Sequence, residues 1–307
     1  MPIFKKNPFG HILWIKKVLI RILGVISHGR YRSFNNLKIE GSEVLRNLPD
    51  TNVLFISNHQ TYFADVAAMF HVFNASLKGR DDSIKNIGYI WNPKLNLYYI
   101  AAGETMRSGI LPKIFAYTGS VSIDRTWRSA GENVNRQVKM SDISNISKAL
   151  DDGWVITFPQ GTTTPFKPIR RGTAHIIKTY KPTVVPIVID GFRRSFDKKG
   201  LMIKKRNVLQ SMVIKEPLTI DYENDEISEV HALTSSFDPL YKKIKDHELA
   251  VVTMKSRKGV ICVITNSRHC SFGYDQRVEL FGKKGMLLSG NKKIDSTELF
   301  NSNASNA

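Results

Sequence analysis

The sequence is poor in cysteine and in acidic residues. Its 307 residues include two cysteines, Cys262 and Cys270, at a spacing that matches no metal or redox motif. A reduced cytoplasmic compartment fits this pattern best. The 27 Asp and Glu residues face 45 Lys and Arg, a formal charge of +18, which favours a polyanionic partner: nucleic acid, an anionic bilayer or acidic substrates.

Two kinds of binding motif are also missing. No Cys-rich knuckle, paired zinc-ligand spacing or RNP-like aromatic motif is present, so we do not expect nucleic acid to be the partner. No Gly-x-Gly-x-x-Gly follows a strand, so the usual means of holding a dinucleotide pyrophosphate is lacking. An NAD-dependent oxidoreductase is therefore disfavoured.

What is present begins with a basic amino-terminal segment. Residues 1–32 hold seven Lys or Arg and no Asp or Glu. Their apolar stretch is shorter than the roughly 20 residues that a spanning helix needs, and no A-x-A-like cleavage site follows it. We expect an amphipathic helix in the membrane interface with its cations, Lys16, Lys17 and Arg21, toward anionic headgroups; an ordinary packing helix is the alternative. The apolar face is predicted to comprise Ile12, Ile15, Leu19, Ile22 and Ile26.

The central region alternates strand-like and helix-like patterns. Apolar, β-branched runs predict strands at 53–56, 121–123, 154–158 and 184–189, and helical spacing predicts helices around 143–150 and 172–180. This alternation is typical of a largely parallel α/β sheet, whose functional residues gather at the carboxyl ends of the strands. After about Glu229 the pattern changes to a β-hairpin, 249–254 and 260–264, joined by a Lys-Gly turn.

A histidine and an aspartate follow the first of these strands. His59 lies in the loop after 53–56, and Asp65 comes one to two helical turns later. An imidazole can take a proton from an alcohol while a carboxylate on its other nitrogen fixes the tautomer. A hydrogen-bonded histidine that caps the next helix is an equally weighted alternative for this pair alone.

Three later segments suit an anionic ligand. One strand ends in Asp124 and Arg125, and a planar guanidinium suits bidentate phosphate or carboxylate binding. Phe158–Thr163 follows the next strand, and Arg170 and Arg171 stand just before a helix whose first amides suit an anion. Each arginine alone is better explained as a solvated surface residue, but together they favour an anion site.

Four segments in order resemble the PlsC-type lysophospholipid and glycerolipid acyltransferase family: 58–65, 119–125, 158–162 and 185–188. The resemblance covers residues 1 to about 229. It implies a mostly parallel sheet flanked by helices, with His59 as general base on the acceptor hydroxyl. It also implies a thioester donor of acyl-carrier protein or coenzyme A, and no metal or cofactor. Asp65 is expected to be the second catalytic residue, which orients the His59 ring. The residues expected to bind substrate are Asn58, Gly119, Asp124, Arg125, Pro159, Gln160, Gly161, Thr162, Arg170 and Arg171.

Two departures from the family pattern bear on the site. Five residues separate His59 from Asp65 where the family has four, and an extra helical residue rotates a side chain by about 100°. Either the turn bulges or the pair is looser than usual. Gln160 replaces the family's Glu, which removes a charge and adds donors, so a lyso amino-acid (glycine-type) lipid is an alternative acceptor.

The last segment resembles a different family. Residues 251–264, 266–268, 273–279 and 281–286 are similar to the sheet domain of inositol 2-dehydrogenase-type oxidoreductases. The resemblance covers only part of that domain, and the lysine, His and Asp that such enzymes use in hydride transfer would lie in the absent portion. We therefore expect residues 230–307 to be a truncated β fragment without an activity of its own.

Together these observations predict three regions: a membrane-surface helix at 1–32, an acyltransferase domain at 33–229, and the fragment. The predicted function is an O-acyltransferase at the cytoplasmic face of the bacterial inner membrane. It would transfer a fatty acyl group to a lysophosphatidate-like anionic lipid in phospholipid biosynthesis. The alternative from another class is a lipid-surface binding protein that has lost catalysis.

Overall fold

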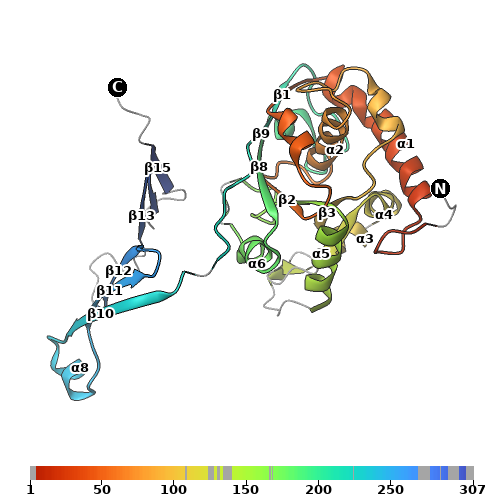
Figure 1. Cartoon of the computed structure of the whole chain (residues 1–307). Coiled ribbons are helices and arrows are strands. Elements are labelled where there is room, and N and C mark those ends of the chain that lie inside the picture. Colours follow the sequence, from red (N-terminus) through yellow and green to blue (C-terminus); the bar gives the residue numbers. More distant parts are fainter. Residues whose placement is uncertain are drawn as a thin grey trace. The chain divides into compact units, whose positions relative to one another are not determined.

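A computed structural model describes residues 5–107, 109–123, 128–129, 132–133, 140–165, 167, 169–223, 225–268, 277–283, 285–289 and 297–301. The chain divides into two compact units, Met1–Ile220 and Asp221–Ala307, which are described separately (Figure 1). The division falls shortly before Glu229, where the sequence pattern changes.

The first unit contains a seven-stranded sheet in the order β1-β9-β8-β2-β7-β3-β4. Every neighbouring pair is parallel except β8 and β9, so the predicted largely parallel sheet is confirmed. The strands are β1 (Asn36–Glu40), β2 (Val53–Ser57), β3 (Leu97–Ala102), β4 (Ser120–Ile123), β7 (Trp154–Thr157), β8 (Thr183–Asp190) and β9 (Leu209–Ile214). The sequence pattern did not predict β1, β3 or β9.

Helices cover both faces of this sheet (Figure 1). Val53 and Phe55 of β2 belong to one core cluster with Phe73, whereas Leu54 belongs to a second cluster with Ile146. Side chains alternate between the two faces of a strand, so each face has its own core. The helices are α1 (Leu13–Arg32), α2 (Ala64–Ser76), α3 (Gly103–Arg107), α4 (Ile110–Tyr117), α5 (Met140–Asp152), α6 (Arg171–Tyr180) and α7 (Phe192–Ser195), with 3-10 turns η1 (Ser42–Asn47) and η2 (Ile87–Trp91) and the short pair β5 (Arg128–Ser129) and β6 (Glu132–Asn133).

Helix α1 packs against the unit through a face that the sequence pattern did not predict. Its buried residues are Lys16, Ile20, Gly24 and Tyr31. Gly24 lies close to Ile90, because a Cβ at position 24 would be 1.6 Å from Cδ1 of Ile90 and would have to displace it. The expectation that Lys16 faces headgroups is therefore wrong: packing of α1 on the sheet takes this lysine inward.

The buried Lys16 ammonium lies 4.5 Å from the centroid of the Tyr98 ring and has no hydrogen-bond partner among the described residues. Burial lowers its pKa to about 7, although the carboxylate of Asp152 acts in the opposite direction. Arg21 is also engaged within the protein, since its guanidinium bonds to the Trp91 carbonyl and stacks on that ring.

The outer face of α1 is apolar. Its exposed large side chains are Trp14, Val18, Ile22, Val25 and Ile26. Across the parts of the chain that the structure describes, no helix combines the length and apolarity needed to cross a bilayer.

The second unit consists of two three-stranded antiparallel sheets. One contains β10 (Ile227–Ser235), β11 (Leu249–Ser256) and β12 (Ile261–Ser267), and the other β13 (Val278–Gly282), β14 (Gly285–Ser289) and β15 (Thr297–Asn301); α8 (Pro239–Lys243) lies between β10 and β11 in the chain. The predicted hairpin of 249–264 is confirmed by the pairing of β11 with β12. Among the side chains of this unit that the structure describes, which exclude those of 297–301, no apolar one is buried.

Candidate active site

His59 and Asp65 lie where a central strand passes into a helix. Strand β2 ends at Ser57, and α2 begins at Ala64, which places Asp65 in its first turn. The Asp65 side chain is fully buried, and its Oδ2 lies 2.9 Å from Nδ1 of His59. The loop between the two residues therefore brings them into direct contact despite its five-residue length.

The carboxylate of Asp65 organises this loop. It accepts hydrogen bonds from the backbone N–H of Gln60, at 2.6 Å, and of Thr61, at 3.0 Å, and from the Thr61 hydroxyl, at 2.6 Å. An ionised carboxylate only accepts, so Nδ1 of His59 carries the proton. The other ring nitrogen, Nε2, is left as the potential base.

The His59 ring is also held by an aromatic neighbour. Phe158, directly after β7, stacks on it with ring centroids 3.9 Å apart and planes at 18°. Strands β2 and β7 are neighbours in the sheet, so the loops that follow them meet at the same edge. Phe158 was not predicted as a site residue, although it begins the 158–162 segment and directly follows a strand.

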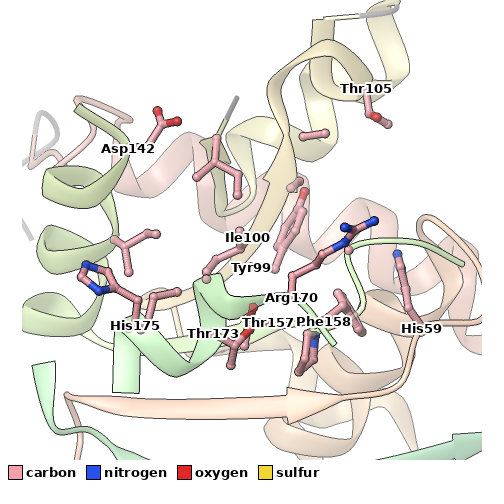
Figure 2. Close-up of a pocket in the computed structure, with 18 of the residues that line it drawn as sticks. His59, Tyr99, Ile100, Thr105, Asp142, Thr157, Phe158, Arg170, Thr173 and His175 are labelled. Carbon is pink, nitrogen blue, oxygen red and sulfur yellow. The ribbon is translucent and has the colours of Figure 1, made fainter. Parts of the chain in front are cut away.

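A cavity of about 570 Å³ opens beside His59. His59 and Arg170 project into it from one side, and Asp142 and His175 lie at the opposite side (Figure 2). Much of the remaining wall is apolar and comes from α2, β3, α3, β4, α5 and α6, including Val66, Ile100, Met106, Ile123, Ile143, Ile146 and Ile176. The cavity thus joins a histidine and cations to an apolar chamber.

The predicted arginines lie at the start of a helix. Arg170 is the N-cap of α6, Arg171 is its first residue, and both line the cavity. The backbone N–H of Arg170 donates to the Pro159 carbonyl at 2.8 Å. Pro159 and Gly161 line the cavity too, so the loop after β7 and the first turn of α6 form one side of the site.

Other predicted contact residues have their polar groups occupied within the protein. The Asn58 amide bonds to both the N–H and the carbonyl of Ile189 at 2.8 Å, which ties β2 to β8. Gln160 donates to the Lys167 carbonyl at 2.8 Å, and the Thr162 hydroxyl bonds to Thr164. Neither Asn58, Gln160 nor Thr162 is among the residues that line the cavity.

Gly119 precedes β4, at the end of the strand opposite to Ile123, which reaches the cavity. A Cβ at position 119 would lie 2.4 Å from the Leu97 carbonyl oxygen. The glycine at this position therefore permits the close approach of β4 to β3. Asp124 and Arg125 lie outside the described residues.

Comparison with known proteins identifies the two segments separately. The acyltransferase family model matches residues 36–190, and the model of the GFO/IDH/MocA C-terminal domain matches residues 220–288. The chain belongs to the acyltransferase family. Both resemblances predicted from the sequence are confirmed.

Several similar proteins match a short part of the chain. They include the uncharacterized oxidoreductase YrbE of Bacillus subtilis, 37% identical over 75 residues (24% of this chain and 22% of YrbE), and the myo-inositol 2-dehydrogenase of Thermotoga maritima, 41% identical over 68 residues (22% and 20%). The chain thus spans about a fifth of the length of these relatives.

A solved structure is similar to a larger part of the chain. It is the 1-acyl-sn-glycerophosphate (LPA) acyltransferase PlsC from Thermotoga maritima, with 20% identity and a TM-score of 0.41 over 66% of this chain and 68% of that one.

Proposed function

We propose that this protein is an O-acyltransferase that moves a fatty acyl group from an acyl-carrier protein or coenzyme A thioester to the hydroxyl of a lysophosphatidate-like lipid. The observation that carries the proposal is the contact of His59 with buried Asp65 at 2.9 Å, at the edge of a cavity with an apolar chamber and an arginine-bearing helix start. Membership of the acyltransferase family supports the reaction class.

The arrangement suits direct transfer without an acyl-enzyme. Nε2 of His59 takes the proton of the acceptor hydroxyl while its oxygen forms a bond to the thioester carbonyl carbon. Asp65 stabilises the imidazolium through Nδ1. When the tetrahedral intermediate collapses, the carbon–sulfur bond breaks and the leaving thiolate receives the proton from His59. No metal ion or other cofactor is required by this sequence of steps.

The two ends of the cavity suit the two parts of a lysolipid. Arg170 and Arg171, with the first amides of α6, suit an anionic headgroup. The apolar side chains around Ile143 and Ile176 suit an acyl chain. The Asp124–Arg125 pair of the family motif is proposed to contribute to the same headgroup.

The glycine-type acceptor was suggested by the neutral side chain of Gln160. Its amide donates to the Lys167 carbonyl, a bond that a carboxylate could not make, so Gln160 is explained by loop structure. We therefore favour the phosphate acceptor. Incubating the chain with each lysolipid and analysing the products by mass spectrometry distinguishes the two acceptors.

Replacement of His59 tests the proposal directly. His59→Ala should lower turnover by roughly 10²–10⁴-fold, the range typical of a general base, in an assay of radiolabelled acyl transfer from acyl-carrier protein and from coenzyme A. The control is His247→Ala, an exposed histidine of the second unit. A wild-type chain that binds vesicles but forms no diacyl product would favour the lipid-binding alternative.

We also propose that the exposed face of α1 attaches the protein to the cytoplasmic face of the bacterial inner membrane. Ile22 and Ile26 are 51% and 62% exposed, and cations near an anionic surface add about 1 kcal/mol each. Ile22→Ser/Ile26→Ser should reduce sedimentation with anionic vesicles. The matched control, Leu240→Ser/Ile244→Ser, changes two similarly exposed residues of the second unit and should sediment as wild type; equal sedimentation of both variants would exclude α1 as the anchor.

A further inference from the structure

A tight turn at Asp197–Gly200 lies against the His59–Asp65 loop. The turn closes on itself, because the Gly200 N–H donates to the Asp197 carbonyl at 2.9 Å and Asp197 Oδ1 accepts from the N–H of Leu201 and of Met202, at 2.8 and 2.9 Å. Burial acts to raise the pKa of Asp197, but backbone hydrogen bonds, first that of Met202, lower it below its usual value. Asp197 therefore holds the turn as a carboxylate.

This turn supplies hydrogen-bond acceptors for the loop. The N–H of Tyr62 donates to the Lys198 carbonyl at 3.2 Å, and the N–H of Phe63 donates to the Lys199 carbonyl at 3.0 Å. The carboxylate of Asp65 already accepts hydrogen bonds from the N–H groups of Gln60 and Thr61. The four amides of residues 60–63 are thus satisfied half by Asp65 and half by the turn, so the path of the loop depends on both.

The contact is closest at Gly200. This residue has a φ of +77°, and a Cβ on it would lie 2.6 Å from the Ala64 backbone nitrogen and 2.9 Å from Oγ1 of Thr61. Both neighbours are buried, at 2% and 0% exposure, so neither can move aside freely. Oγ1 of Thr61 is also the atom that donates to Asp65 at 2.6 Å.

The turn is fixed from behind as well. Phe196, which precedes it, is buried against the Tyr31 ring of α1, with centroids 5.8 Å apart. The guanidinium of Arg30 donates to the Gly200 carbonyl at 3.3 Å, and the Tyr31 hydroxyl donates to the Ala64 carbonyl at 2.8 Å. These contacts join the first helix to both the turn and the loop.

We propose that the turn 197–200 positions His59 and Asp65, and that Gly200 is the residue of this turn on which their positioning depends. The proposal rests on the function proposed above. Asp65 accepts two of the four amides of residues 60–63, and the turn accepts the other two. Without a side chain at position 200, the loop can lie close enough for Thr61 and His59 both to reach the carboxylate.

The test compares three variants in the full chain. Gly200→Ala adds the Cβ that the loop has no space for, and Gly200→Asn adds it on a residue that tolerates positive φ. Gly79→Ala is the matched control, because Gly79 has a φ of +74° and no atom within 4 Å of the added Cβ. Backbone strain is then similar in the Gly200→Ala and Gly79→Ala variants, and only the contact with the loop differs.

Both Gly200 variants should lose kcat by about 10- to 100-fold, the range expected for a displacement of about 1 Å in a catalytic geometry, with little change in acceptor KM. The proton NMR signal of the His59 Nδ1–H, hydrogen-bonded to Asp65, should shift or vanish in both and remain in Gly79→Ala. Wild-type kcat in either Gly200 variant, or an unchanged Nδ1–H signal in both, would overturn the proposal.

Failure of the proposed function and failure of the proposed role of the turn would give different results. A wild-type chain without acyl transfer would contradict the proposed function, yet the NMR comparison would still test the role of the turn. If Gly200→Ala does not fold, Asp197→Ala weakens the turn without adding an atom near the loop. Its kcat should fall less than that of Gly200→Asn, and wild-type kcat in a folded Asp197→Ala would contradict the proposal.

Discussion

Strands of similar composition are buried in one unit of this protein and exposed in the other. All four residues of β7, Trp154–Thr157, are buried, whereas all seven of β12, Ile261–Ser267, are exposed. Both strands contain β-branched apolar residues, and Ile261 and Val263 of β12 are 68% and 60% exposed. The difference arises from what covers the strands, since β7 has helices on both sides of its sheet and β12 has no such layers among its own unit's described residues.

Burial in this chain is therefore a property of the assembled layers more than of any strand's sequence. The first unit can hold a hydrogen-bonded pair such as His59 and Asp65 in a fixed geometry because its core is packed on both faces. The second unit, which contains most of the match to the GFO/IDH/MocA C-terminal domain model, has no buried apolar side chain among those that the structure describes.

The largest effect is expected for Asp65. Asp65→Ala should reduce turnover by about 10²–10⁴-fold, close to the loss for His59→Ala, since groups that act as one unit lose most of their effect when either is removed. The double variant should be little worse than either single one. Steady-state acyl transfer is the measurement, with Asp81→Ala as control because Asp81 makes a partly exposed ion pair with Arg46.

A loss of less than about threefold in a folded Asp65→Ala would contradict the role assigned to the pair. Melting curves are needed alongside, because removal of the carboxylate leaves the N–H groups of Gln60 and Thr61 without acceptors. Asp65→Asn, of similar volume, serves as the second variant if Asp65→Ala does not fold.

The next effect concerns the buried Lys16. Its pKa is about 7 in the folded protein against 10.5 for an ordinary lysine. Below pH 7 it is protonated in both states, so the cost of burying its charge is present in full. Between pH 7 and 10.5 the folded chain has released the proton that the unfolded chain keeps, so stability rises with pH; above 10.5 the cost is gone.

Lys16→Met should therefore raise the free energy of unfolding of the first unit at pH 6 by a few kcal/mol, since each pKa unit corresponds to about 1.4 kcal/mol. The gain should shrink as pH approaches 10. Urea unfolding followed by tryptophan fluorescence measures it. The control is the neighbouring Lys17→Met, on a less buried lysine bonded to Asn92, which should not raise the free energy of unfolding at pH 6. A destabilised Lys16→Met would show that the ammonium has a partner that stabilises it.

Lys16 also shows what the sequence pattern could and could not predict. Helical spacing predicted the helix correctly, but α1 has apolar residues on two sides, so periodicity could not say which side faces inward. Strand ends predicted the position of His59 and of the arginines at α6, because parallel strands bring the loops that follow them to one edge. Local patterns could not reveal that Asn58 binds Ile189 or that Gly200 supports the loop, since both contacts join segments more than a hundred positions apart.

The smallest effect is expected when the second unit is removed. A chain ending at Ile220 keeps every strand of the seven-stranded sheet, because β9 ends at Ile214. Acyl transfer should stay within about twofold of that of the full chain, and the melting temperature of the first unit should stay within a few degrees, as expected for a separately packed domain.

The full chain should not bind NAD in calorimetry, because it lacks the glycine-rich turn that would receive the pyrophosphate. Amides of β12 should exchange faster than those of β7 in the full chain, since exposed strands with few buried contacts open at low cost. A tenfold loss of transfer on truncation, or saturable NAD binding, would show that the exposed strands have a working role and that the two units differ less than their packing indicates.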